Sequence, residues 1–262
     1  MPVSLPLPIR RMSQDEFGEL SFTVMRHVFA IHNEMGRFFD ERVYKQELAH
    51  RLPNVRLEQP LDVTFDSFRK RYFVDVLVGD GALFEFKAVE SLSDRHRAQL
   101  LHYLLLCDVA HGKLINVRAE KVQHSFVNTL WRHADRIHFQ LETARWDAKL
   151  PGASRLQDFL TAMLYDLGTG LEIPLYEEAV THCFGGKPQV EADVDVELGG
   201  RRLGHQRLRL IAPGVALKIT GLEKEVDGFE VHARRLLAHV DLRAIAWVNI
   251  NMKQVTFVTI ER

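Results

Sequence analysis

The sequence predicts an α/β protein made of two tandem units, each a mixed β-sheet flanked by helices. Two observations lead to this prediction. Apolar residues recur at helical spacing in some segments and form short strand-like runs in others, in an order that occurs twice along the chain. The chain also resembles itself at a nearly fixed shift, which indicates an internal repeat. With 262 residues, 46% of them hydrophobic, the chain is long enough for two domains with buried cores.

The first half is expected to contain two helices, three strands, a third helix and two more strands. Apolar residues recur at the three- and four-residue spacing of a helix at Phe22, Met25, Val28 and Phe29. The second helix should end before Pro53, because the residue before a proline disfavours helical geometry. Ser93 or Asp94 is a suitable N-cap for the third helix. The expected helices span about 14–35, 38–51 and 93–108, and the expected strands about 56–65, 71–79, 83–89, 113–118 and 124–128.

The second half repeats this order of elements. Its expected helices span about 154–167, 173–183 and 227–240, and its strands about 189–198, 206–212, 215–221, 244–251 and 254–260. The predicted organisation is therefore a first unit over residues 1–130, a connector over 131–152, and a second unit over 153–262.

The repeat is visible residue by residue. At a shift of 132, Gly36 meets Gly168 and Tyr44 meets Tyr176. At a shift of 133, residues 58–117 pair without gaps with residues 191–250, and about eleven of the sixty pairs are identical. Chance would give roughly four. The alternative is that two α/β segments share a periodicity by coincidence.

Composition narrows the class of protein. The net charge is −1, whereas a strong non-specific nucleic-acid binder is usually basic. No apolar run has the roughly 18–20 residues of a membrane span, and the N-terminus does not read as a signal peptide. The two cysteines, Cys107 and Cys183, lie in apolar helical patterns, which favours buried reduced thiols. We therefore expect a cytoplasmic protein that is not bound to a membrane.

Charged residues inside two apolar strands point to chemistry. Asp75 interrupts the run Phe73–Val78, and Glu85 and Lys87 lie two residues apart in the next strand. Side chains alternate along a strand, so Glu85 and Lys87 share a face. Isolated charges among apolar residues are costly and need a partner, a metal or solvent. An Asp followed by Glu-x-Lys on a neighbouring strand is typical of a metal-dependent phosphodiesterase site. Without Asp75, an exposed ion pair between Glu85 and Lys87 would explain the second motif.

The flanking segments carry a resemblance to a known family. The stretch Ile31–Gly36, followed by Phe39–Tyr44, resembles the opening of the GxxExxY proteins, members of the PD-(D/E)XK nuclease superfamily. Its continuation is also similar, in Phe73-Val-Asp75, Phe84-Glu-Phe-Lys87, Ala98-Gln-Leu-Leu-His-Tyr103 and Lys113-Leu-Ile-Asn116. The resemblance covers about residues 20–118. One position departs from the family pattern, because Phe38 stands where the named glycine is expected.

The resemblance implies restriction-endonuclease-like units and a site for Mg²⁺ or Mn²⁺. Asp75 and Glu85 would be metal ligands, with the main-chain carbonyl of Phe86 as a third, and Glu41 would add an acidic ligand. Lys87 would orient or deprotonate the attacking water. Gln99, with Tyr103 one helical turn later, would border the site and contact a phosphate or the lysine. A solvated charge at Glu41 and, for Gln99 and Tyr103, a capped helix with a buried tyrosine are the alternatives.

The second copy lacks these residues. Under the same alignment, its counterparts of the five candidate residues (Glu41, Asp75, Glu85, Lys87 and Gln99) are Ile173, Leu208, Lys218, Thr220 and His232. We therefore expect any active site to lie in the first copy and the second to be a degenerate repeat that serves as a scaffold or recognition half. The two copies could pair as an intramolecular pseudo-dimer, as two subunits of a dimeric ancestor would.

Three classes of function remain open from the sequence. The first is a metal-dependent nuclease that hydrolyses DNA or, as a second choice, RNA. The second is a non-catalytic module that keeps the fold and binds nucleic acid or protein, which the near-neutral charge favours. The third is an enzyme acting on a smaller phosphate ester, or a structural protein with vestigial carboxylates. Basic clusters at Arg69–Arg71 and Arg95–Arg97 flank the motif and would suit a polyanion, although solvated surface charge is the commoner meaning.

Overall fold

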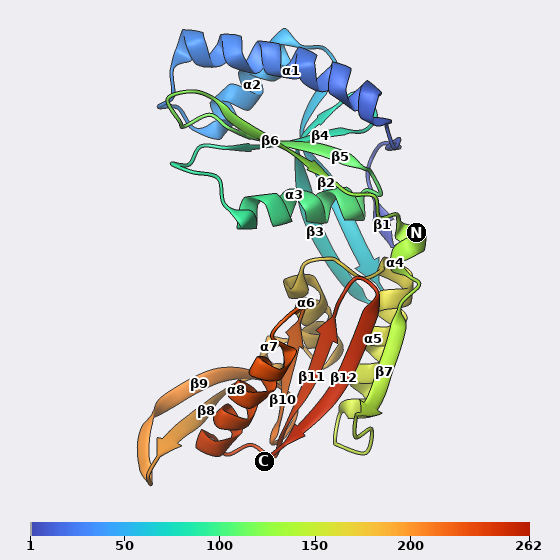
Figure 1. Ribbon diagram of the computed structural model, residues 1–262, viewed down its shortest axis with the longest axis vertical. Coiled ribbons are helices and arrows are strands. Elements are labelled where there is room, and N and C mark those ends of the chain that lie inside the picture. Colours follow the sequence, from blue (N-terminus) through green and yellow to red (C-terminus); the bar gives the residue numbers. More distant parts are fainter. Residues whose placement is uncertain (1) are drawn as a thin grey trace. The chain divides into compact units, whose positions relative to one another are not determined.

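The computed structural model describes residues 2–262 and divides the chain into two compact units, Met1–Asp135 and Arg136–Arg262. Each unit contains a six-stranded mixed sheet flanked by helices (Figure 1), which confirms the predicted fold class. Cys107 and Cys183 are both free thiols. Within residues 2–262, no helix has the length and apolar character needed to cross a membrane.

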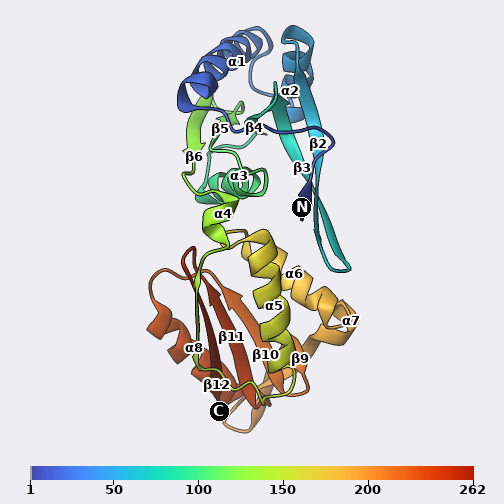
Figure 2. The same cartoon turned by 90° about the vertical axis from the view of Figure 1, so that its right-hand side faces the viewer.

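The first unit has strand order β1-β2-β3-β4-β5-β6, in which only β4 and β5 run parallel. Helices α1 and α2 cover one face of the sheet and α3 covers the other (Figures 1 and 2). The elements are β1 (Val3–Ser4), α1 (Gln14–Met35), α2 (Glu41–Arg51), β2 (Val55–Phe65), β3 (Phe68–Val78), β4 (Ala82–Lys87), α3 (Asp94–Leu106), β5 (His111–Asn116) and β6 (Gln123–Asn128).

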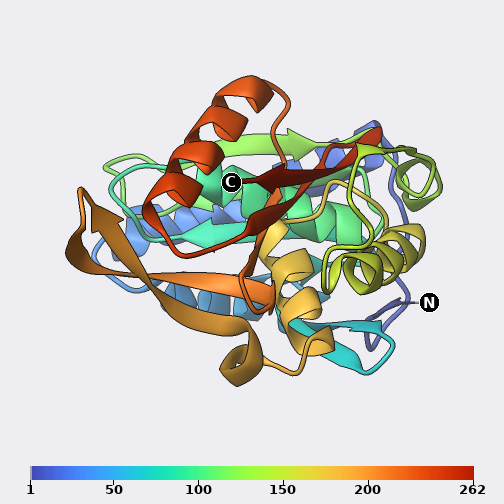
Figure 3. The same ribbon diagram turned by 90° about the horizontal axis from the view of Figure 1, so that it is seen from below.

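The second unit has strand order β7-β12-β11-β10-β9-β8. Helices α5 and α6 lie on one side of the strands and α8 on the other (Figures 2 and 3). A short helix, α4 (His133–Arg136), lies at the boundary between the units. The remaining elements are β7 (Gln140–Arg145), α5 (Ala153–Leu167), α6 (Ile173–Cys183), α7 (Lys187–Val190), β8 (Glu191–Leu198), β9 (Arg201–Ala212), β10 (Val215–Thr220), α8 (Val226–His239), β11 (Ala244–Ile250) and β12 (Gln254–Glu261).

Local sequence explains how helices α1 and α2 begin, end and are joined to each other. Ser13 and Glu16 form a reciprocal capping box at the start of α1. Gly36 ends α1 with φ of 75°, a left-handed value that glycine adopts without a steric penalty. The Tyr44 hydroxyl donates to the Gly36 carbonyl at 2.7 Å and so ties the start of α2 to the end of α1. The second unit contains the same bond, from Tyr176 to Gly168, also at 2.7 Å.

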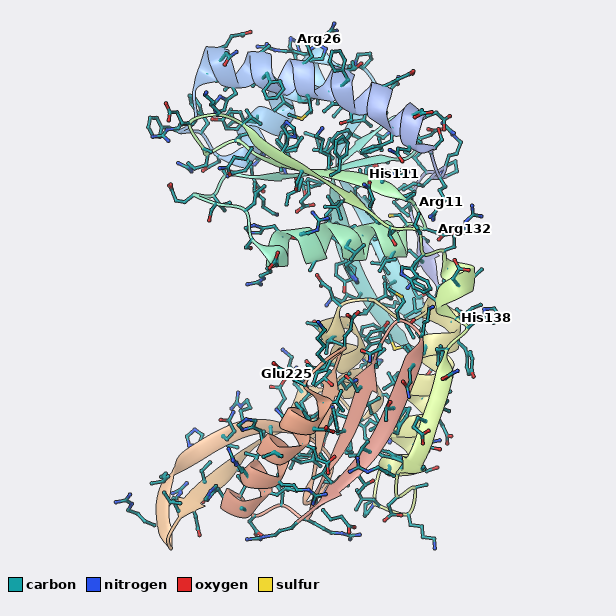
Figure 4. All side chains as sticks on the ribbon, in the orientation of Figure 1. Arg11, Arg26, His111, Arg132, His138 and Glu225 are labelled. Atoms are coloured by element: carbon teal, nitrogen blue, oxygen red, sulfur yellow. The ribbon has the colours of Figure 1, made fainter. Side chains whose placement is uncertain are left out.

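The chain that leads into α1 is also fixed to the first unit. Arg11 lies near the start of β5, where His111 is found (Figure 4). Its guanidinium donates to the main-chain oxygens of Asp108 at 3.2 Å and Thr129 at 3.4 Å. Close packing at the β3–β4 turn adds to this, because a Cβ on Gly81 would lie 2.0 Å from the Arg10 carbonyl oxygen.

Pairing registers agree between the two sheets at the shift of 133 residues. In the parallel pair, Glu85 lies opposite Leu114, and Lys218 lies opposite Trp247. The neighbouring antiparallel pairs, β5 with β6 and β11 with β12, agree as well. Residues 111 and 116 lie opposite 128 and 123 in the first sheet, and residues 244 and 249 lie opposite 261 and 256 in the second. A side-chain contact is also shared, because Asn116 bonds both the main-chain N–H and the carbonyl of Val89, and Asn249 does the same with Leu222.

Some elements differ from the sequence prediction. The segment predicted as a connector contributes β7, which pairs in parallel with β12 at the edge of the second sheet. β1 pairs with β2 at the edge of the first sheet. Helix α2 begins at Glu41 and not near residue 38, because Asp40 has the extended φ and ψ of an N-cap. The two sheets therefore share five strands with the same neighbours, and each carries an additional edge strand of its own.

Candidate functional site

A fork between strands β3 and β4 creates the candidate site. The two strands pair only from Val78 opposite Ala82 to Val76 opposite Phe84. Beyond this point β3 continues beside β2, and β4 continues beside β5. One further step of the same register would place Asp75 opposite Glu85. The fork therefore brings together the two carboxylates that the sequence singled out.

Asp75 fills the fork with hydrogen bonds on both oxygens. Oδ2 accepts the main-chain N–H of Phe86 at 2.7 Å, a donor that the diverging β3 backbone does not reach. Oδ1 accepts from the Lys45 ammonium of α2. Burial raises the pKa of Asp75 to about 6, although its bonds with Lys45 and Phe86 act in the opposite direction.

The buried Glu85 and the partly buried Lys87 form an ion pair on one face of β4. The Lys87 Nζ lies 2.6 Å from Glu85 Oε1, and Glu85 is only 3% exposed. This burial rules out the exposed ion pair that the second motif alone would allow. Burial raises the pKa of Glu85 to about 7, with the Lys87 charge opposing the shift and the Asp75 charge adding to it. The second oxygen of Glu85, Oε2, is buried and has no hydrogen-bond partner.

Glu41 stands at the first turn of α2, within electrostatic reach of both carboxylates. Its charge raises the pKa of Asp75 and of Glu85. Its Oε1 lies 3.9 Å from Lys45 Nζ, one helical turn along α2. Three of the predicted residues, Glu41, Asp75 and Glu85, thus share one electrostatic environment, and Lys87 pairs with the last of them.

Gln99 is placed differently. Its amide donates to the Tyr103 hydroxyl at 3.3 Å along α3. Tyr103 is buried and α3 is capped by Ser93, as in the alternative of a capped helix with a buried tyrosine. The first turn of α3 is nevertheless near Lys87, because the charge of Lys87 contributes to lowering the pKa of His96 after the larger effect of burial. Gln99 therefore lies on the helix that borders the pair, bonded within that helix.

Two residues of the site were not identified from the sequence. Lys45 is 3% exposed and reaches Glu58 Oε1 at 2.5 Å as well as Asp75. Burial lowers the pKa of Lys45, but its hydrogen bonds to Asp75 and Glu58 outweigh that effect and raise it overall. A signal was present, because Lys45 follows the buried Tyr44 and lies three residues before the buried Leu48. A lysine at such a position on a helix is expected to be paired.

The donor set suits a hard divalent cation. Carboxylate oxygens are the ligands that Mg²⁺ and Mn²⁺ prefer, and the unsatisfied Glu85 Oε2 is a buried acceptor of this kind. Within residues 2–262, however, no three or more His, Cys, Asp or Glu side chains are arranged to hold a metal ion. Lysine ammonium groups contact Asp75 and Glu85 instead.

The corresponding region of the second unit has no acidic residue at the positions of the candidate acids. A Cβ placed on Gly221 would lie 3.4 Å from Ile173, which occupies the position of Glu41. Thr220, at the position of Lys87, donates to Asn249 at 2.7 Å and accepts from the Trp247 indole at 2.9 Å. In the first unit the helix provides the base, Lys45, and the strand provides the acid, Asp75. In the second unit the helix α6 provides the acid, Glu177, and the strand β9 provides the base, Arg209, at 3.1 Å.

Comparison with known proteins places this site in context. Residues 18–128 match the family model of the PD-(D/E)XK nuclease superfamily. The match lies within the first unit and includes every residue of the site described above. No curated protein and no solved structure matches the chain.

Proposed function

We propose that the first unit, whose residues 18–128 match the family model of the PD-(D/E)XK nuclease superfamily, hydrolyses phosphodiester bonds of DNA, or of RNA as the second choice, with Mg²⁺ or Mn²⁺. The observation that carries the proposal is the ion pair of the buried Glu85 with Lys87, beside Asp75 in the strand fork. Two carboxylates whose pKa values burial raises are costly to the fold, and such groups concentrate at functional sites.

The chemistry follows from the placement of these groups. Asp75 and Glu85, with Glu41 as a third acid, would hold the cation, which supplies charge neutralisation and water activation when bound. Lys87 is the cation of the protein nearest to Glu85 and would orient the attacking water and stabilise charge that develops on the phosphate. Gln99 would contact the phosphate or Lys87 from α3. The GxxExxY resemblance is consistent with these roles, with Glu41 and Tyr44 on the same turn of α2.

We also propose that the second unit is a degenerate duplicate of the first. Shared strand neighbours, the shift of 133 residues in two strand pairs, and the matched Tyr–Gly and Asn–backbone bonds support this origin. The replacement of all the candidate acids there supports placing the chemistry in the first unit alone.

A binding module without cleavage is the second candidate function. It is favoured by one observation, namely that the Lys45 ammonium already neutralises Asp75. The proposed nuclease and the binding module differ in a single measurable property, which is turnover.

A cleavage assay on purified protein separates the two. Single-stranded, duplex and branched DNA and a matched RNA are incubated with Mg²⁺ or Mn²⁺, and products are resolved by length. We expect Lys87→Ala to lower the cleavage rate by about 10²–10⁴-fold with little loss of metal binding. Asp75→Asn should abolish cleavage through loss of the cation.

The matched control is Lys218→Ala, because Lys218 occupies the position of Glu85 in the second unit. This variant should cleave as the wild type does and at most bind substrate more weakly as salt is raised. Cleavage that survives Lys87→Ala combined with Asp75→Asn would come from another site or a contaminant. Binding of all these substrates without cleavage would favour the binding module.

A further inference from the structure

Lys45 occupies an unusual position for a lysine. It lies on the inner side of α2 and is almost fully buried, and its ammonium contacts Asp75 and Glu58 and lies 3.9 Å from Glu41. Buried lysines are rare unless they are paired. Here the ammonium has several acidic neighbours and no single dedicated partner.

Glu58 is held in a conformation that points to a specific role. On β2 it has φ of 50°, a left-handed value that few residues other than glycine adopt inside a strand. The residues on either side of it pair normally with β3, Leu57 with Val76 and Gln59 with Val74. Glu58 therefore lies at the level of Asp75, where the ladder is interrupted. Non-glycine residues at positive φ cost free energy and cluster at functional sites.

The charge balance of this group is incomplete. Four carboxylates, from Glu41, Glu58, Asp75 and Glu85, surround the ammonium groups of Lys45 and Lys87. In the fully ionised form two negative charges remain, which is the charge that one divalent cation would compensate. One buried acceptor, Glu85 Oε2, also lacks a hydrogen-bond partner.

We propose that Lys45 is an internal counter-cation that holds Asp75 in the metal-free protein and yields this place to a divalent cation. Glu58 then receives the displaced ammonium, which it already contacts. A monovalent and a divalent cation on the same carboxylate oxygen would repel each other strongly in a buried environment, so the two compete for Asp75 Oδ1. This inference rests on the proposed metal-dependent function and adds to it a residue that sets metal affinity.

A purely structural role for Lys45 predicts the opposite change in metal affinity when Lys45 is removed. If Lys45 were only a structural anchor, its removal would leave Asp75 and Glu58 unpaired, disturb the fork and weaken cation binding. If it competes with the cation, its removal exposes the same carboxylates to the metal and strengthens binding. Metal affinity, measured without any substrate, therefore distinguishes the two.

The test is Mn²⁺ titration by calorimetry of the wild type, Lys45→Met and the control Lys121→Met, which removes an exposed lysine of the same unit. Lys45→Met should bind Mn²⁺ at least about tenfold more tightly, because 1.4 kcal/mol of relieved repulsion corresponds to that factor. Without metal it should melt at a lower temperature, and Mn²⁺ should raise its melting temperature more than that of the wild type. Lys121→Met should match the wild type in both respects.

A second measurement on the wild type avoids any folding defect of the variant. Amine-specific labelling followed by mass spectrometry should modify Lys45 faster with Mn²⁺ than without it, relative to Lys121. Equal or weaker Mn²⁺ binding by Lys45→Met, or unchanged labelling of Lys45, would overturn the proposal. If the wild type binds Mn²⁺ and Lys45→Met binds no better, only the role of Lys45 fails. If neither protein binds Mn²⁺, the metal-dependent function fails with it.

Discussion

The two units share five strands with the same neighbours but carry opposite kinds of side chains at one level of the sheet. In the first unit, the fork between β3 and β4 holds Asp75 and Glu85 with two lysines. In the second, the corresponding level holds Leu208 and Lys218, and Thr220 is fixed by bonds to Asn249 and Trp247. This comparison distinguishes the residues that are needed to build the sheet from those, such as Asp75 and Glu85, that a sheet of this kind does not require.

The shared contacts are those that build the sheet. The Tyr–Gly bond that joins two helices and the Asn side chain that bridges a loop occur in both units with similar distances. The buried acids occur in one unit only. Because the second unit folds without them, their cost in the first unit is best explained by function.

The largest expected difference concerns cation binding. Asp75→Asn combined with Glu85→Gln removes two of the three carboxylates proposed to hold the cation, so we expect no heat of Mn²⁺ binding above background. Lys218→Gln in the second unit should leave binding unchanged. Titration calorimetry at one pH and salt concentration makes the comparison. Equal binding by the wild type and the double variant would show that the cation lies elsewhere.

The next difference concerns the pH dependence of stability. The pKa of Glu85 is raised from 4.5 to about 7 in the folded protein, so the folded state holds a proton that the unfolded state releases. The free energy of unfolding should therefore fall as pH rises from about 4.5 to 7, by about 3 kcal/mol from Glu85 alone, and level off above that range. Asp75, raised from 3.8 to about 6, adds to the fall over its lower range.

Glu85→Gln tests whether the free energy of unfolding falls as pH rises, because a neutral amide removes the titrating group. The metal-free variant should lose much of the decline between pH 5 and 7, and at pH 8 it should gain stability, less what the lost bond to Lys87 contributed. Lys218→Gln should keep the wild-type slope. Chemical denaturation at several pH values measures both. A Glu85→Gln protein with an unaltered slope would mean that Glu85 does not hold its proton as described.

The smallest expected difference concerns the matched tyrosines. Tyr44→Phe and Tyr176→Phe each delete a hydroxyl that donates to a glycine carbonyl at 2.7 Å, so each should cost about 1 kcal/mol. The cost should be somewhat larger for Tyr176, whose hydroxyl also accepts from the Leu171 N–H. Only Tyr44→Phe should lower the cleavage rate, since α2 carries Glu41 and Lys45. Equal effects on cleavage would remove the distinction between the units.

The sequence predicted the parts of the site whose charge conflicts with their surroundings. Asp75, Glu85 and Lys87 stood out because they interrupt apolar strands, and the antiparallel pairing of β3 with β4 brings the first two together. Strand alternation placed Glu85 and Lys87 on one face, where they form their ion pair.

Lys45 and Glu58 were not predicted, for physical reasons. A Glu and a Lys four residues apart on a helix normally form a solvated pair, and this reading of Glu41 and Lys45 outweighed the burial signal from the apolar neighbours of Lys45. The role of Glu58 depends on a left-handed backbone conformation, which cannot be predicted from the sequence at a non-glycine residue. The edge strand β7 was missed because its mostly exposed residues lack an apolar alternation.

The central claim is that the carboxylates of the first unit, and not the second, hold a divalent cation. Crystals grown with Mn²⁺ and measured for its anomalous scattering locate the ion directly. We predict one strong peak in contact with Asp75 and Glu85, with the Lys45 ammonium moved toward Glu58, and no such peak near Lys218 and Thr220. A peak in the second unit, or none at the fork with Mn²⁺ present in excess, would contradict this account.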